Sequence, residues 1–157
     1  MPLAWRLSAP EYATRLDGKG NAERGARWNS PGRGVVYTSF NLSLAVLESL
    51  AQLPPSLRSR IPELTAVRIE IPDDLPRGEV ARSEFPDGLA GEAGARRCRE
   101  LGNAWLAEGR LLALAVPSVI VPQEQNLLIN PAHSRFDQVR VVTTEAFRFD
   151  DRLSVSS

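Results

Sequence analysis

The fold of this chain is decided by residues 25–48, which read GARWNSPGRGVVYTSFNLSLAVLE. Glycines and a proline are frequent in its first ten positions, a composition typical of a loop that ends in a tight turn. The apolar run at residues 35–38 then predicts a short buried strand. Ser39 or Asn41 is the expected N-cap of a helix over residues 42–53, because two prolines follow directly.

Three side chains in this stretch have the chemistry to bind a nucleotide. Arg27 lies on the loop, Tyr37 near the end of the expected strand, and Glu48 about two turns into the expected helix. An arginine fork suits a phosphate, an aromatic ring suits a flat heterocycle, and a carboxylate accepts hydrogen bonds from sugar hydroxyls. The structural alternative is a solvated arginine, a core tyrosine and a glutamate on the polar face of its helix. Spacing alone leaves both interpretations open.

Length and composition limit the classes of protein to consider. A chain of 157 residues with 43% hydrophobic content can bury one core, so we expect a single domain. The formal charge is zero, which argues against a nucleic acid or an anionic membrane as partner. A single cysteine, Cys98, excludes an internal disulfide and a multi-cysteine metal site. Without a signal-peptide pattern or an apolar run long enough to span a membrane, a cytoplasmic location is expected.

The remaining segments predict an α+β fold, a single compact domain with short, mostly antiparallel strands and two main helices. The second main helix is expected at residues 92–108, and a shorter one at residues 10–17. A loop is expected from Gly18 to Arg27. Residues 72–91 are rich in Pro, Gly, Asp and Arg, which indicates a long connection of the kind that forms a lid or a binding edge. Further strands are expected at residues 3–7, 63–71, 111–116, 118–121, 126–130 and 139–144. We place the domain at residues 1–150 and a flexible tail at 151–157.

Other chemistry finds little support. His133 is the only histidine, and no serine has the glycine pattern of a nucleophile elbow, so a Ser-His-Asp hydrolase is disfavoured and His133 is expected to be a turn residue. One His and one Cys cannot make a zinc site, and no metal is expected. Cys98 lies on the apolar face of its helix and should be a buried small hydrophobe. Ser118 lies among apolar residues and, if buried, must bond either to the backbone or into a polar site.

Five motifs in order resemble the RES domain, a family named for its Arg, Glu and Ser. They are residues 26–32, 35–39, 44–48, 116–118 and 126–133. The resemblance implies a fold like that of ADP-ribosyltransferases. It further implies the toxin of a bacterial toxin–antitoxin system that cleaves NAD⁺ at the nicotinamide–ribose bond, depleting NAD⁺ and arresting growth.

Carried onto this sequence, the resemblance implies a catalytic set of Arg27, Tyr37, Glu48 and Ser118. Arg27 would grip the pyrophosphate, Tyr37 would pack on the nicotinamide or ribose, and Ser118 would orient Glu48 or Arg27. Asn126 is a further candidate for the substrate-binding wall.

The same resemblance implies NAD⁺ as substrate without a separate cofactor, and a cognate Xre-type antitoxin with a helix-turn-helix domain that covers the cleft. Whether the chain forms a homodimer is left open. The acceptor could be water, phosphate or a protein, the last making the chain a protein ADP-ribosyltransferase. The competing class is a non-catalytic module that binds a nucleotide or the antitoxin.

Overall fold

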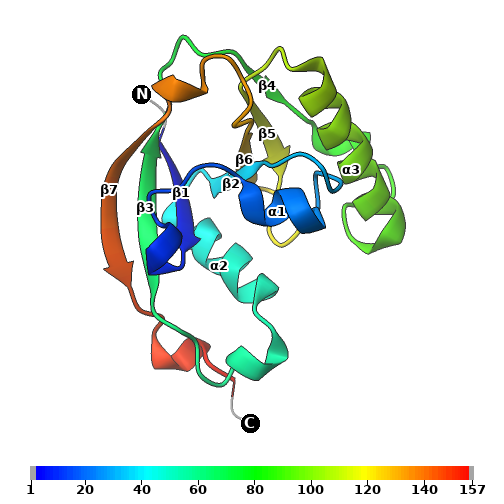
Figure 1. Cartoon of the computed structure of the whole chain (residues 1–157). Helices are drawn as coiled ribbons and strands as arrows, with labels where there is room; N and C mark the ends of the chain where they lie inside the picture. Colours follow the sequence, from blue (N-terminus) through cyan, green and yellow to red (C-terminus); the bar gives the residue numbers. More distant parts are fainter. Residues whose placement is uncertain (1–2, 156–157) are drawn as a thin grey trace.

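Seven strands form one sheet in the order β4-β5-β6-β2-β1-β3-β7, in a computed structural model that describes residues 3–155 (Figure 1). All neighbouring strands run antiparallel except β4 and β5, which are parallel. The predicted α+β class with mostly antiparallel strands is therefore confirmed. The strands are β1 (Leu3–Ser8), β2 (Val36–Ser39), β3 (Leu64–Glu70), β4 (Arg77–Glu79), β5 (Ala113–Pro117), β6 (Gln125–Ile129) and β7 (Arg140–Phe147).

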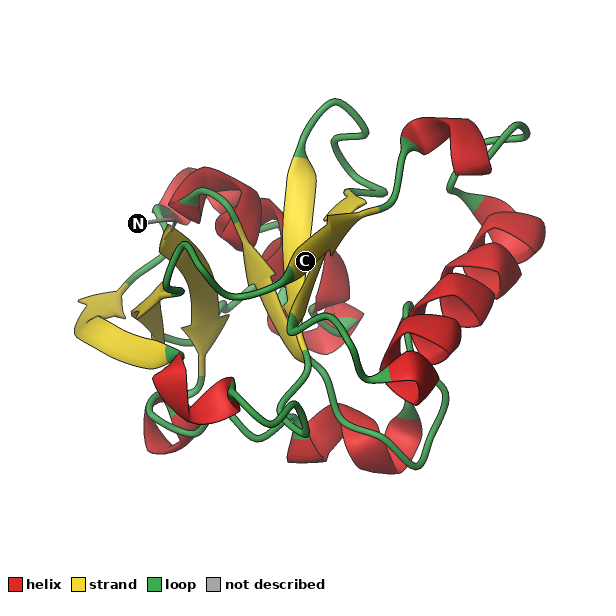
Figure 2. Cartoon of the chain, turned by 90° about the horizontal axis from the view of Figure 1, so that it is seen from above, coloured by secondary structure: helices red, strands yellow, loops and turns green. Residues whose placement is uncertain are grey.

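Both predicted main helices are present, as α2 (Leu42–Gln52) and α3 (Gly91–Glu108). Asn41, one of the two expected caps, is the N-cap of α2, because its Oδ1 accepts a 2.8 Å hydrogen bond from the Leu44 N–H. Helix α3 buries one face, with Cys98 fully buried as expected. Figure 2 shows α3, the longest helix, lying along one side of the molecule.

A third helix, α1 (Lys19–Arg24), occupies the segment that was predicted to be a loop. The expected helix at residues 10–17 is reduced to a 3₁₀ turn at Pro10–Tyr12. The chain reverses at Gly18, whose φ of 65° suits glycine, and a Cβ there would meet the Val35 amide nitrogen at 2.7 Å. Helix α1 thus begins where two distant segments touch, a contact that local composition does not show.

Two further predictions were wrong in detail. Residues 118–121 form a turn instead of a strand, because Ser118 Oγ accepts hydrogen bonds from the Ile120 and Val121 N–H groups at 3.1 Å each. The connection at residues 72–91 contains β4 and a 3₁₀ turn at Arg82–Glu84. The remaining 3₁₀ turns are Pro55–Leu57, Phe136–Gln138 and Asp151–Leu153.

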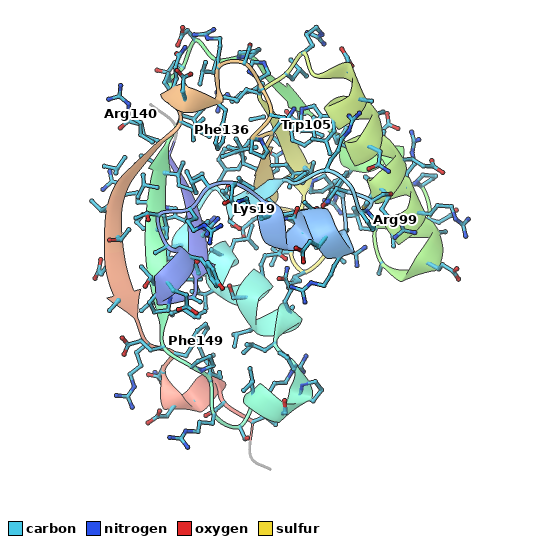
Figure 3. All side chains as sticks on the ribbon, viewed as in Figure 1. Lys19, Arg99, Trp105, Phe136, Arg140 and Phe149 are labelled. Atoms are coloured by element: carbon cyan, nitrogen blue, oxygen red, sulfur yellow. The ribbon has the colours of Figure 1, made fainter. Side chains whose placement is uncertain are left out.

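Two hydrophobic cores lie on opposite faces of the sheet. In β6, Leu127 and Ile129 belong to one core while Leu128 belongs to the other, as the alternation of a strand requires. One core fills the space between the strands and α3, where Trp105 is labelled in Figure 3. Burial of these side chains, each contributing roughly 1.5–3 kcal/mol, is what holds α3 on the sheet.

The sheet is weakest between β1 and β2, which pair at a single position, Trp5 opposite Ser39. The next pair in that register would be Leu7 with Tyr37, yet both of these residues line a cleft. Helix α2 packs against both strands. The divergence of β1 from β2 therefore opens the space in which the side chains of the candidate site gather.

Beyond the predicted domain boundary at residue 150, the C-terminal segment contacts the segment that follows α2. The Val155 N–H donates a 2.8 Å hydrogen bond to the Arg58 carbonyl. The last two residues of the predicted tail lie outside the described residues, so the tail's flexibility stays a prediction. Within residues 3–155, no helix has the length and apolar character needed to cross a membrane.

Candidate active site

The cleft beside β1 and β2 has a volume of about 920 Å³. Its lining comes from β1, α1, β2, α2, β6 and the turn after β5, so it is assembled from segments far apart in the sequence. Lys19, which also lines the cleft, is labelled near the middle of the molecule in Figure 3. The space is large enough for a dinucleotide, since pockets for drug-sized ligands typically measure about 300–1,000 Å³.

Glu48 presents its carboxylate to the cleft. It projects from the middle of α2 and is only partly buried. Ser118 Oγ donates to its Oε1 at 2.8 Å, and Asn126 Nδ2 donates to the same oxygen at 2.7 Å. In the described part of the chain, no donor reaches the other oxygen, Oε2. One oxygen thus holds the side chain in place while Oε2 is left for a ligand.

Ser118 lies behind Glu48, fully buried, and does not line the cleft. Its hydroxyl proton goes to Glu48, and its oxygen accepts the two N–H groups of the turn that follows. A hydroxyl has one proton and two lone pairs, so the Ser118 hydroxyl makes all the hydrogen bonds that it can. Ser118 is therefore suited to orient Glu48, one of its two predicted roles, and has no free electron pair for nucleophilic attack.

Arg27 is exposed and lines the cleft from the loop between α1 and β2. Its Nη1 donates to the Leu89 carbonyl at 3.4 Å, which gives the connection at residues 72–91 a contact with the site. No carboxylate of residues 3–155 forms an ion pair with Arg27. Its guanidinium therefore keeps its charge available to an anionic ligand.

The loop that carries Arg27 is held against α3 at two points. Asn103 donates to Ser30 Oγ at 2.8 Å and accepts from the Ser30 N–H at 3.0 Å. At the preceding residue of α3, Gly102 lies so close to the Trp28 carbonyl that a Cβ would meet its oxygen at 1.7 Å. Helix α3 is thus the rigid support from which the Arg27 loop reaches the cleft.

Tyr37 lines the cleft from β2, but its hydroxyl is bonded within the protein. The hydroxyl donates to Asn29 Oδ1 at 2.6 Å and accepts from the Trp28 N–H at 3.1 Å. Burial raises the pKa of Tyr37 above its usual value, so the phenol stays protonated. The ring of Tyr37 is what remains to contact a ligand.

Arg6 is a site residue that the sequence interpretation missed. It lines the cleft from β1, and its Nε is buried without a hydrogen-bond partner among the described residues. Burial lowers the pKa of Arg6, and no carboxylate forms an ion pair with it in the described chain. The one available signal was a charged residue in the middle of an otherwise apolar strand. Arg6 Nη2 donates to Ser8 Oγ at 3.2 Å and to the Tyr12 carbonyl at 3.0 Å, so what Arg6 offers an anion in the cleft is a positive charge that no carboxylate of the described chain balances.

The cleft thus brings together four of the five residues predicted for the site, Arg27, Tyr37, Glu48 and Asn126, with Ser118 directly behind them. His133 is elsewhere and, as expected, is held in a turn: its Nδ1 accepts from the Arg135 N–H at 3.1 Å. Over residues 3–155, no cluster of His, Cys, Asp or Glu could hold a metal ion.

Comparisons with known proteins identify related sequences and a similar fold. Residues 3–150 match the family model of the RES domain. The chain is 36% identical over 155 residues to the Prs ADP-ribosylating toxin of Sphingobium sp. (strain YBL2), covering 95% of this chain and 94% of that toxin. It is 33% identical over 153 residues to Toxin Res of Yersinia enterocolitica, covering 96% and 99%.

A similar fold occurs in the M. tuberculosis MbcT–MbcA toxin–antitoxin complex. The TM-score is 0.69, and the match covers 92% of this chain and 83% of that chain at 14% sequence identity. At this level of identity the likeness concerns the fold.

Proposed function

This chain belongs to the RES domain family and is the toxin of a toxin–antitoxin system, and we propose that it cleaves NAD⁺ at the nicotinamide–ribose bond. The observation that carries the proposal is the Glu48 carboxylate, held through Oε1 alone, in a cleft that also presents two guanidinium groups without carboxylate partners. A dinucleotide with a pyrophosphate and a cationic glycoside matches this combination of charges.

The reaction suits a site with few acid–base groups. The bond between the ribose anomeric carbon and the pyridinium nitrogen breaks, and its electron pair neutralises the ring, so nicotinamide leaves without being protonated. Water then adds to the ribose and loses a proton, giving ADP-ribose. The protein must stabilise the oxocarbenium-like ribose and position the attacking group. A carboxylate close to the developing positive charge supplies the main electrostatic term.

Each cleft residue has a role in this scheme. Glu48 Oε2 bonds the hydroxyls of the nicotinamide ribose and faces the developing cation. Arg27 and Arg6 bind the pyrophosphate, and the Tyr37 ring packs on the nicotinamide or the ribose. Ser118 and Asn126 hold Glu48, and Asn126 also forms part of the wall. No cofactor besides the NAD⁺ substrate, and no metal, enters this scheme.

The test compares the purified protein with its Glu48→Gln variant in the presence of NAD⁺. Nicotinamide, ADP-ribose, ADP-ribose phosphate and labelled protein are followed together. We expect nicotinamide release from the wild type and none from the folded variant. The co-product identifies the acceptor as water, phosphate or protein. A folded Glu48→Gln variant that turns over NAD⁺ at the wild-type rate would refute the assignment.

Protein ADP-ribosylation is the second candidate, because the relative with 36% identity is named as an ADP-ribosylating toxin. The same cleft serves both reactions, since they differ only in the group that attacks the ribose. Labelled protein in place of free ADP-ribose would favour this candidate. If no nicotinamide is released under any condition, the remaining candidate is a module that binds a nucleotide without cleaving it.

We further propose that a cognate Xre-type antitoxin with a helix-turn-helix domain neutralises this chain in the cytoplasm by covering the cleft. The fold shared with the toxin of a toxin–antitoxin complex supports an antitoxin partner. Co-expression with a neighbouring helix-turn-helix protein should relieve growth arrest and yield a complex without NAD⁺ turnover. Whether free protein is a homodimer can be measured by sedimentation in the same experiment.

A further inference from the structure

We infer that Ser39 is a positioning residue for Glu48, acting through the side-chain amide of Asn126. Ser39 Oγ donates to Asn126 Oδ1 at 2.6 Å, and Asn126 Nδ2 donates to Glu48 Oε1 at 2.7 Å. The three side chains form one chain of hydrogen bonds that runs from the centre of the sheet to α2. Its effect on catalysis rests on the proposed function, in which Glu48 faces the substrate ribose.

The direction of this chain follows from the chemistry of its ends. An ionised carboxylate only accepts hydrogen bonds, so the NH₂ group of Asn126 must face Glu48. The amide oxygen must then face Ser39, and only a hydroxyl that donates can satisfy it. If the amide were reversed, its oxygen would lie against the carboxylate and repel it. The Ser39 proton therefore opposes this reversal and holds the donor toward Glu48.

The backbone keeps Ser39 at this position. Ser39 pairs with Asn126 on β6 and with Trp5 on β1, and the latter is the single pair that joins β1 to β2. Only 3% of Ser39 is exposed to solvent, so water cannot easily replace its hydroxyl. Ser39 thus marks the point where the sheet divides, with only the Asn126 side chain between it and the Glu48 carboxylate.

The neighbouring residue on β2 offers a matched control. Thr38 is also buried, and its hydroxyl donates to the Leu127 carbonyl at 2.7 Å. Successive residues of a strand point to opposite faces, so this hydroxyl lies on the face away from Glu48. Thr38→Val removes a buried hydroxyl from the same strand while leaving the Ser39–Asn126–Glu48 chain intact.

The experiment measures kcat and KM for NAD⁺ together with the NMR signals of the Asn126 side-chain NH₂ group, assigned by their loss in Asn126→Asp. We expect Ser39→Ala to lower kcat about tenfold with KM within about twofold, the effect of one lost hydrogen bond on a positioned group. The NH₂ signals should move toward their position in Glu48→Gln. Ser39→Thr, which keeps the hydroxyl, should restore kcat and the signals, and Thr38→Val should change neither by more than about twofold.

Two results would overturn the inference. One is a folded Ser39→Ala protein in which the Asn126 signals do not move, and the other is an equal loss of kcat in Thr38→Val. If the wild type does not turn over NAD⁺, the proposed function fails while the inference does not, because the NH₂ signals test the Ser39–Asn126–Glu48 chain without any substrate. Backbone amide spectra of each variant show whether it is folded.

Discussion

The Tyr37 hydroxyl donates a 2.6 Å hydrogen bond to Asn29 Oδ1, and this bond ties β2 to the loop that carries Arg27. Asn29 is fully buried, and its Nδ2 donates to the Arg33 carbonyl at 2.9 Å. The aromatic ring of the cleft and its exposed cation are therefore parts of one hydrogen-bonded unit. A change at Tyr37 should affect substrate binding at Arg27 as well as contact with the ring.

Tyr37→Phe should separate the two functions of this residue. The ring stays, but Asn29 Oδ1 and the Trp28 N–H lose their partner, which should lower the free energy of unfolding by about 1–3 kcal/mol. Because the Arg27 loop loosens, KM for NAD⁺ should rise more than kcat falls. Urea unfolding and steady-state kinetics check both effects. An unchanged free energy of unfolding would show that the hydrogen bonds of the Tyr37 hydroxyl do not stabilise the fold.

Ser118→Ala should lower kcat by about tenfold to a hundredfold, the range for losing a hydrogen bond to a charged group. The Ile120 and Val121 N–H groups also lose their acceptor, so stability should fall by about 1–3 kcal/mol. Since the Ser118 hydroxyl is fully used, mass spectrometry of quenched wild-type reactions should find no ADP-ribose on Ser118. A covalent adduct there would contradict the positioning role.

Arg6→Met should weaken substrate binding with little effect on the fold. Removing a half-buried guanidinium without an ion-pair partner among the described residues is favourable, but the substitution also removes the Nη2 hydrogen bonds to Ser8 Oγ and the Tyr12 carbonyl, so the free energy of unfolding should change by no more than about 1 kcal/mol. KM for NAD⁺ should rise about tenfold or more, because a charged contact to the pyrophosphate is lost. Thermal unfolding and kinetics on the same samples measure both.

Arg68→Met is the matched control for the Arg6→Met variant. Its Nε is also buried without a partner in the described chain, but its guanidinium lies 6.0 Å from the centre of the Trp5 ring and does not line the cleft. We expect KM for NAD⁺ to stay within about twofold of the wild type. A KM change equal to that of Arg6→Met would mean that both substitutions act through the fold.

Gly102→Ala should separate α3 from the Arg27 loop. A Cβ would overlap the Trp28 carbonyl oxygen at 1.7 Å, so the helix or the loop must move, at a cost of about 3 kcal/mol. Gly20→Ala in α1 is the control, because a Cβ there meets no atom within 4 Å. That change should stabilise by about 0.5–1 kcal/mol. Chemical denaturation of the two variants should therefore give shifts of opposite sign.

Patterns within one segment were the reliable guides to the fold. The two-residue alternation of β3 and the polar cap and proline stop of α2 predicted those elements to within a few residues. Helix α1 and strand β4 were missed because they are six and three residues long. Segments this short do not show the 3.6-residue hydrophobic period of a helix or the two-residue period of a strand. The turn after β5 was predicted as a strand because its residues are apolar, whereas the Ser118 oxygen bends it.

By itself, the sequence determined which side chains to expect in the candidate site. It names Arg27, Tyr37, Glu48, Ser118 and Asn126, since their motifs follow one another in order along the chain. Only the tertiary structure decided how they are used: that Ser118 and Asn126 share Oε1 of Glu48, that Arg6 joins the cleft, and that Ser39 stands behind Asn126. The physical reason is that a side chain's chemistry belongs to its residue, whereas its partners come from segments up to 87 positions away that meet only when the sheet forms.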